Sequence, residues 1–185
     1  MFSIVGLGNP GIEYSRNRHN AGYMAVDEIT SYIGIENWKL KNKSHISKGS
    51  VNDTSVVFLK PKTFMNLSGN SVKETINFYK IPSKNVIVIH DDLDLELGKI
   101  KAKFGGGNAG HNGLGNISQL IGNDYYRLRI GIGHPGKNNV SKFVLEDFKD
   151  DELIIIKNII NYIKENINLI INNDLQKFNQ NSNNY

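Results

Sequence analysis

Cysteine is absent from the sequence of 185 residues. This absence excludes disulfide bonds, thiolate metal sites and a cysteine nucleophile, and nothing in the composition points to an oxidising compartment. The sequence also lacks the roughly 18 uninterrupted apolar residues that a membrane-spanning helix needs. The first residues, Met1 to Ile4, carry no basic region ahead of a long apolar stretch. We therefore expect no secretory signal, no membrane partner and a cytoplasmic location.

Acidic residues are slightly fewer than basic ones. The chain has 22 Lys and Arg against 18 Asp and Glu, which gives a formal net charge of +4. A positive surplus favours an acidic partner such as nucleic acid. The chain is rich in Asn, Ile and Lys throughout, however, and a biased codon pool would produce the same surplus. Charge alone therefore leaves both interpretations open.

Length and apolar content predict one domain. A chain of 185 residues with 39% hydrophobic residues can bury one well-formed core but is too short for two ordinary domains. We assign residues 1–176 to this domain. Residues 177–185 are almost all Asn, Gln and Ser, a composition typical of a disordered tail.

Apolar runs alternate with helical periodicity along the chain, which predicts a three-layer α/β/α fold with a mixed, mostly parallel central sheet. The unbroken apolar run 86–89 is typical of a central strand buried on both faces, whereas the alternation of lysines with apolar residues over 99–104 predicts a strand with one wet face. The expected strands are 2–5, 55–59, 86–90, 99–104 and 128–132, and the expected helices are 21–33, 69–79, 113–121 and 152–172.

The glycine-rich run Gly6 to Gly11 follows the first expected strand and satisfies the pattern G-x-G-x-x-G of dinucleotide-binding loops. Such a loop must open directly into a helix whose N-terminus receives the pyrophosphate. Here residues 12–18 are polar and aperiodic, and helical spacing starts only at Ala21. The context therefore argues against a dinucleotide and leaves the glycines as room for a ligand to approach the backbone around Asn9.

Polar residues collect directly after the expected strands, where α/β sheets bind their ligands. Asn9 follows the first strand, residues 60–66 the second and residues 91–94 the third, and His111 and Asn112 end a glycine-rich loop. No serine stands in a G-x-S-x-G turn, so a hydrolase built on this chain would use water directly. Asn9, Asn66 and Asn112 offer both donor and acceptor, which suits an ester or peptide group better than a phosphate.

His19 and Asp91 are the candidate acid–base pair. A neutral imidazole can take a proton from water, and a carboxylate on its other nitrogen fixes the tautomer; the base alone contributes roughly 10²–10⁴-fold. Taken singly, each residue could equally be a cap or a surface group. We expect no metal at residues 90–92, since adjacent strand residues point to opposite faces and the chain has no second histidine at a helical ligand spacing.

Five separated motifs stand in order over most of the chain: Gly-Leu-Gly-Asn-Pro-Gly at 6–11 with Tyr14 and Arg-His-Asn-Ala-Gly at 18–22; Phe-Met-Asn-Leu-Ser-Gly at 64–69; His-Asp-Asp-Leu-Asp at 90–94; Gly-Gly-Gly at 105–107 through Gly-His-Asn-Gly-Leu at 110–114; and Arg-Leu-Arg-Ile-Gly-Ile-Gly-His-Pro-Gly at 127–136. In sequence and order these motifs resemble those of the bacterial peptidyl-tRNA hydrolases. Two positions depart from the family pattern: Gly8, where alanine is frequent, and Asn108-Ala109, where His-Gly is frequent.

This resemblance implies hydrolysis of the ester between a peptide and the 3′-terminal adenosine of tRNA, by a monomer that needs no metal or organic cofactor. It implies that His19 activates water, that Asp91 holds His19, and that Asn9 distinguishes peptidyl from aminoacyl substrates. The residues implied to bind the substrate are Tyr14, Phe64, Asn66 and Asn112 at the tRNA end and peptide backbone, and Lys101, Lys103 and Arg129 at the acceptor-stem phosphates. The period of a strand places both lysines on one face.

Two rival classes stay open at this point. A non-catalytic RNA-binding module would explain the charge and the glycine loops but would leave the pair of His19 and Asp91 without a role. A nucleotide-dependent oxidoreductase would use the glycines at 6–11 instead.

Overall fold

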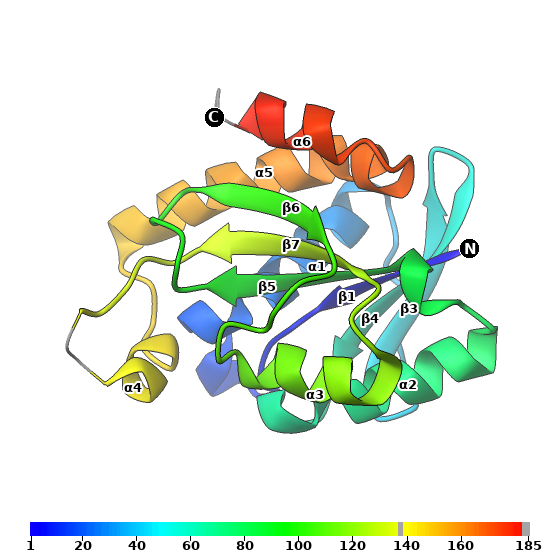
Figure 1. Ribbon diagram of the computed structural model, residues 1–185, viewed down its shortest axis with the longest axis horizontal. Coiled ribbons are helices and arrows are strands. Elements are labelled where there is room, and N and C mark those ends of the chain that lie inside the picture. The colour runs from blue at the N-terminus through cyan, green and yellow to red at the C-terminus, as the bar shows by residue number, and fades with distance from the viewer. Residues whose placement is uncertain (137–138, 183–185) are drawn as a thin grey trace.

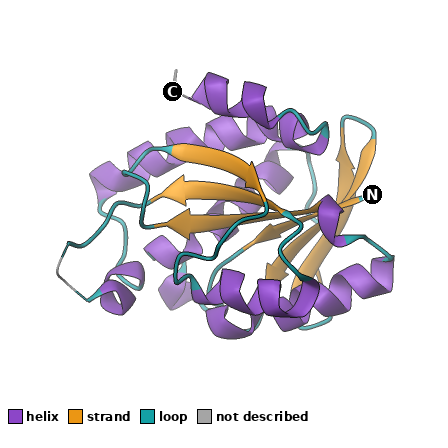
Figure 2. Cartoon of the chain, in the orientation of Figure 1, coloured by secondary structure: helices purple, strands orange, loops and turns teal. Residues whose placement is uncertain are grey.

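A seven-stranded mixed sheet forms the centre of the computed structural model, which describes residues 1–136 and 139–182. The strand order is β2-β3-β4-β1-β5-β7-β6; β4, β1, β5 and β7 pair in parallel, while β2, β3 and β6 join antiparallel at the two edges (Figure 1, Figure 2). The strands are β1 (Phe2–Gly6), β2 (Lys39–Lys41), β3 (Ser44–Val51), β4 (Thr54–Pro61), β5 (Val86–Asp92), β6 (Ile100–Phe104) and β7 (Tyr126–Gly131).

Helices cover both faces of this sheet (Figure 1). Helices α1, α5 and α6 pack on one face together with Ile4, Ile87 and Ile89, and α2 and α3 pack on the other with Val86 and Val88. Alternate side chains of β5 thus pack into the cores on opposite faces of the sheet. This confirms the predicted three-layer fold and the prediction that this strand is buried on both faces. The helices are α1 (Ala21–Tyr32), α2 (Ser68–Tyr79), α3 (Asn112–Ile121), α4 (Val140–Val144), α5 (Asp150–Ile171) and α6 (Leu175–Ser182).

Two glycines set the distance between α1 and the sheet. A Cβ atom on Gly22 would lie 2.2 Å from the carbonyl oxygen of Ile89, and one on Gly6 would lie 2.3 Å from the carbonyl oxygen of Gly22. The helix therefore rests directly on the backbone of β1 and β5. This close approach leaves the short 3₁₀ turn Arg18–Asn20, which leads into α1, in contact with β5, and Asn20 bonds to Asn9 after the end of β1.

Sequence periodicity missed β2, β3 and α4. Strand β3 buries Ser44 and Ser47, and the Ser47 hydroxyl donates to the carbonyl oxygen of Asn37 at 2.9 Å. Its pattern therefore looks polar although most of the strand is covered. Helix α4 has only five residues, too few for a period, and begins with Asn139 accepting from the backbone N–H of Lys142.

The expectation of a disordered tail is corrected over residues 177–182, which belong to helix α6. Phe178 is fully buried in the core, and the side-chain amide of Asn179 exchanges two hydrogen bonds with the backbone of Ala102 in β6, at 2.7 and 2.8 Å. Asn179 thus provides the donor and acceptor that a neighbouring strand would offer to this sheet edge. Residues 183–185 lie outside the described residues. No helix in the described part of the chain is long and apolar enough to span a membrane.

Candidate active site

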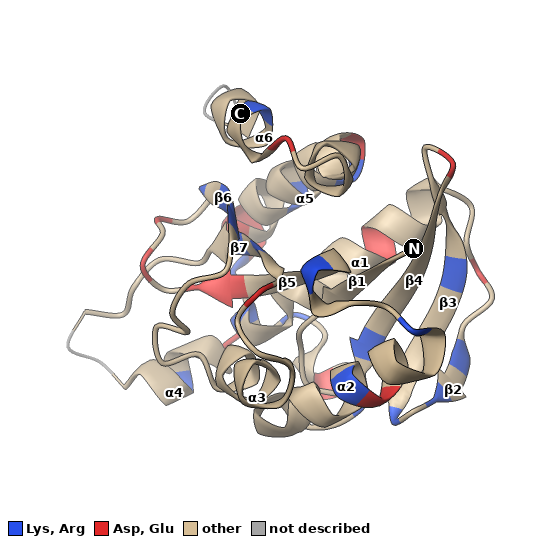
Figure 3. Cartoon of the chain, turned by 45° about the vertical axis from the view of Figure 1, so that its right-hand side comes forward, with Lys and Arg blue, Asp and Glu red and all other residues tan. Residues whose placement is uncertain are grey.

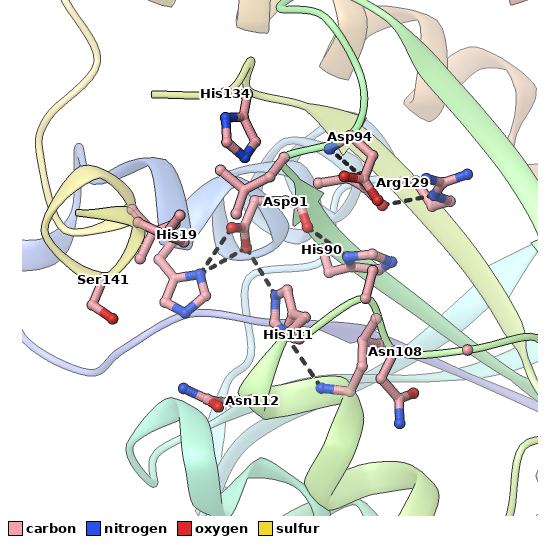
Figure 4. Close-up of a pocket in the computed structure, with 18 of the residues that line it drawn as sticks. His19, His90, Asp91, Asp94, Asn108, His111, Asn112, Arg129, His134 and Ser141 are labelled. Carbon is pink, nitrogen blue, oxygen red and sulfur yellow. Dashed lines mark hydrogen bonds and ion pairs between the residues drawn. The ribbon is translucent and has the colours of Figure 1, made fainter. Parts of the chain in front are cut away.

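Three side chains from distant parts of the sequence meet at the carboxyl end of β5. Asp91 lies near the end of that strand, His19 comes from the 3₁₀ turn before α1, and His111 is the N-cap residue of α3. The Nδ1 atom of His19 lies 2.9 Å from both carboxylate oxygens of Asp91, and Nε2 of His111 lies 3.1 Å from one of them. Figure 4 shows both rings pointing at Asp91. The structure therefore brings together the predicted pair and adds a second imidazole to it.

Backbone contacts determine where the protons of this group lie. The backbone N–H of Leu114 donates to Nδ1 of His111 at 3.3 Å, so the proton of that ring resides on Nε2 and is donated to Asp91. An ionised carboxylate only accepts, hence His19 also donates to it from Nδ1. The Nε2 atom of His19 is left with its lone pair free, which is the form that a general base requires.

The charges reinforce this arrangement. Burial raises the pKa of Asp91, but the opposing effects of His19 and His111 are larger together and hold that pKa well below its usual range. Burial lowers the pKa of His19, but the charge and hydrogen bond of Asp91 outweigh it, so the pKa lies above the ordinary value. The carboxylate thus stays ionised and makes His19 a stronger base than a free imidazole.

His90 is a third imidazole nearby with a different state. Burial is the largest cause that lowers its pKa, to about 3. Its Nδ1 atom lies 2.6 Å from the backbone carbonyl oxygen of Asp91, to which it donates. His90 is therefore a neutral packing residue against His111, with the two rings edge to face at 5.2 Å.

Asn9 is buried and held from two sides. Its backbone exchanges two hydrogen bonds of 2.9 Å with the side chain of Asn20, and its side-chain Oδ1 accepts from the backbone N–H of Met65 at 2.9 Å. Because Oδ1 is occupied, the amide NH₂ group is fixed in direction. Among the described residues this NH₂ group has no hydrogen-bond partner, so it remains available as a donor.

A cavity of about 290 Å³ opens beside the three side chains. His19, Asp91 and Asn112 line it together with the loop after β6 and with α4, whose Ser141 lies on the same side as His19 in Figure 4. Asn112 and His111 also line an adjoining hollow that includes Asn66. Two of the three singled-out asparagines are therefore exposed to this opening, and Asn9 anchors the turn Met65–Leu67 that carries Asn66.

The basic residues lie on one face of the β6–β7 edge, as the alternation predicted. Lys101 faces Arg129 across the two strands and Lys103 faces Arg127; Figure 3 shows this basic stretch on β6 close to the acidic end of β5. Lys103 and Arg129 line the cavity, whereas Lys101 is exposed outside its lining. Burial, and then the charges of Arg129 and Arg127, lower the pKa of Lys103. Positive charges are thus crowded together here, which favours an anionic ligand.

Some of these residues are already engaged. Arg129 donates from Nε to Asp92 at 2.7 Å, and Arg127 is fully buried with its guanidinium bonded to the loop at Gly107 and Asn108. Tyr14 is half-buried and Phe64 is 58% exposed; neither lines the two cavities described above.

The spacing of His19, Asp91 and His111 would also permit a metal ion, since one ligand atom from each lies within 4.8 Å of the others. Each of these atoms, however, takes part in the hydrogen bonds that fix the two tautomers. The donor set fits a protonated network, and the expectation of no metal stays a prediction. His111 was not among the predicted site residues, although it stands next to Asn112 between two glycines.

The fold and the histidine–carboxylate pair beside an open cavity place the protein among α/β enzymes that carry a candidate acid–base pair at the carboxyl ends of their strands. A family model described as peptidyl-tRNA hydrolase matches residues 3–185. The chain belongs to the peptidyl-tRNA hydrolase family.

Two relatives and one solved structure match this chain over nearly their whole length. The chain is 46% identical over 181 residues to a peptidyl-tRNA hydrolase of Rickettsia bellii, covering 96% of this chain and 97% of the relative. It is 45% identical over 185 residues to one of Pelagibacter ubique, covering 100% of both. The crystal structure of peptidyl-tRNA hydrolase from Acinetobacter baumannii superimposes with a TM-score of 0.93 at 38% identity, covering 100% of this chain and 95% of that one.

Proposed function

We propose that this chain hydrolyses the ester bond between the peptide and the 3′-terminal adenosine of peptidyl-tRNA. Family membership supports the substrate class. The observation that carries the chemistry is the pair of 2.9 Å contacts between His19 Nδ1 and both oxygens of Asp91, beside a cavity that reaches Asn112. The reaction frees tRNA from peptides that have dropped off or stalled during translation, so we place it in the cytoplasm.

The proposed reaction uses one water molecule. His19 takes a proton from water on its free Nε2 while the water oxygen bonds to the ester carbonyl carbon. Negative charge then develops on the carbonyl oxygen, and amide N–H groups such as that of Asn112 stabilise it. When the bond to the ribose oxygen breaks, the imidazolium returns its proton to that oxygen. Asp91 stabilises the charged imidazole throughout but keeps no proton itself.

Asn9 supplies the proposed discrimination between peptidyl and aminoacyl substrates. Its free NH₂ group can donate to a carbonyl oxygen at the blocked α-nitrogen of the substrate. An unblocked aminoacyl ester presents an ammonium group there, which has no acceptor to offer. A site built around such a polar contact rejects ligands that cannot complete it.

We propose that Lys101, Lys103 and Arg129, which we call the basic edge, contact the acceptor stem of the tRNA. Lys103 and Arg129 line the cavity, and Lys101 lies on the same face of β6 as Lys103. Phosphate contacts of this kind position a nucleic acid without reading its sequence. Tyr14, Phe64 and Asn66 are assigned to the rim, where the tRNA end and the peptide backbone enter, and the active form is a monomer.

The test compares two substrates with the purified protein. N-acetyl-aminoacyl-tRNA and unblocked aminoacyl-tRNA are incubated separately, and release of the amino acid is followed. Selective release from the blocked substrate supports the proposal. Binding of tRNA without release from either substrate would favour a non-catalytic RNA-binding module, and a retained dinucleotide would favour an oxidoreductase.

A further inference from the structure

Arg18, the residue directly before His19, is one of the most enclosed charges in the protein. Its side chain is 5% exposed, and its Nη2 donates to both carboxylate oxygens of Glu152 at 2.8 and 2.6 Å. Its Nη1 donates to the backbone carbonyl oxygen of Asp147. The guanidinium also lies 4.6 Å from the ring centre of Phe143 and 5.2 Å from that of Phe148. Contacts therefore hold both terminal nitrogens and the face of the guanidinium, while its buried Nε has no hydrogen-bond partner among the described residues.

The backbone around Arg18 is joined to the same distant segment. The N–H of Arg18 donates to the carbonyl oxygen of Glu146 at 3.1 Å, and the N–H of Phe148 donates to that of Arg16 at 2.9 Å. Between them, Asn17 and Asp147 form an antiparallel bridge, with the side-chain amide of Asn17 donating to the carboxylate at 2.7 Å. We call this paired region, residues 16–18 with 146–150, the clasp.

The clasp links two parts of the candidate active site. Residues 16–18 of the clasp continue directly into His19. Residues 146–150 follow α4, whose residues Val140, Ser141 and Val144 line the cavity. Phe143 of the same helix packs on the guanidinium of Arg18. Glu152 is itself fixed, because its carboxylate also accepts from the backbone N–H of Lys149 at the start of α5. A single buried guanidinium thus contacts α4, the segment that follows it and the start of α5.

We propose that Arg18 is a positioning residue for hydrolysis. It fixes the position of His19 relative to helix α4, which lines the cavity. The inference rests on the proposed function. Arg18 does not line the cavity and does not touch Asp91, so its effect passes through the backbone of His19 and through α4. Displacement of a catalytic group by about 1 Å costs on the order of 10²-fold in rate, which sets the scale of the expected effect.

The test compares Arg18→Met with Arg16→Met. Arg16 belongs to the same clasp, but its pair with Asp150 is exposed, at 50% and 93% for the two side chains, and is worth little. At a temperature well below both unfolding midpoints, we expect kcat of the Arg18 variant to fall about 10- to 100-fold. Its KM should change much less, and the acid limb of its pH profile should stay in place because Asp91 is untouched. Arg16→Met should retain kcat within about twofold.

Two further variants keep the outcome decisive if Arg18→Met does not fold. Arg18→Lys keeps the charge, but its single ammonium group cannot bond to Glu152 and to the Asp147 carbonyl oxygen in the way that the planar guanidinium does. This variant should therefore recover only part of the rate. Glu152→Gln removes the partner charge and should lower kcat in the same direction. A folded Arg18 or Glu152 variant with wild-type kcat overturns the inference. A wild-type protein that fails to release the blocked amino acid would instead overturn the proposed function.

Discussion

Replacement of Asp91 by Asn should abolish most of the activity through the tautomer of His19. Nδ1 of His19 is 2.9 Å from both carboxylate oxygens, so an asparagine places its NH₂ group next to that nitrogen whichever way the amide is turned. His111 fixes the orientation of this amide, because the Nε2–H of His111 requires the amide oxygen as its acceptor. The amide NH₂ then donates to Nδ1 of His19, and the ring proton moves to Nε2.

This shift removes the lone pair that would accept the proton of water. General-base catalysis contributes roughly 10²–10⁴-fold, so kcat should fall at least 100-fold, which corresponds to about 2.7 kcal/mol. The KM should change less than about threefold, because Asp91 is buried and makes its contacts with protein side chains. The remaining activity should also respond differently to pH.

The sign of the pH effect follows from the causes of the His19 pKa. Burial alone would lower this pKa, and the Asp91 charge raises it above the ordinary value. In the wild-type protein the rate therefore falls as pH drops through that raised pKa. In Asp91→Asn the raising charge is lost, so the acid limb of the profile should move to lower pH.

The assay is release of N-acetyl-amino acid from blocked aminoacyl-tRNA across about pH 5 to 8.5, with Asp92→Asn as the matched control. Asp92 is the adjacent carboxylate, but it pairs with Arg129 and not with His19, so its variant should keep kcat within a few-fold. Thermal unfolding of both variants checks that they are folded. Asp91→Asn with wild-type kcat and an unmoved acid limb would refute the reasoning.

Three further predictions concern separate parts of the molecule. Asn9→Asp keeps the acceptor for the Met65 N–H but loses the NH₂ donor, so the preference for blocked over unblocked substrate should fall about 10- to 100-fold, measured as the ratio of kcat/KM values. Lys103→Ala should raise KM and reduce the slope of log KM against log salt by about 0.7–0.9, the loss of one phosphate contact; an unchanged slope would remove Lys103 from the tRNA surface. Phe178→Ala should lower the free energy of unfolding by about 3–5 kcal/mol in urea titration, whereas a tail without a packing role would show no change.

Much of the fold was predictable because the central strands and long helices carry strong patterns. The unbroken apolar run of β5 predicts a buried strand, and the apolar stripe of α5 predicts a helix that covers the core. Helix α6 could not be predicted in this way, since Asn179 and Phe178 are stabilised by partners that lie far away in the sequence, in β6 and α5. Polar composition alone therefore misjudged a segment whose order depends on tertiary contacts.

The site was predictable only in part. His19 and Asp91 are separated by 72 positions, and no local period indicates that they meet. Their chemistry made them a candidate pair, and the motif resemblance implied their roles. His111 and Arg18 stand within the same motifs as predicted residues, but their roles depend on a shared carboxylate and on a buried clasp. The engagement of Arg129 by Asp92 is likewise a feature of cross-strand geometry that the alternation of charges does not reveal.

The central claim is that His19, held by Asp91, activates water for ester hydrolysis. It is tested most directly by the single-turnover rate of His19→Ala on N-acetyl-aminoacyl-tRNA, at saturating enzyme and with folding verified. The rate should fall by at least about 100-fold relative to wild type, while tRNA binding persists through the basic edge. A folded His19→Ala variant that cleaves the ester at a near wild-type rate would contradict the claim.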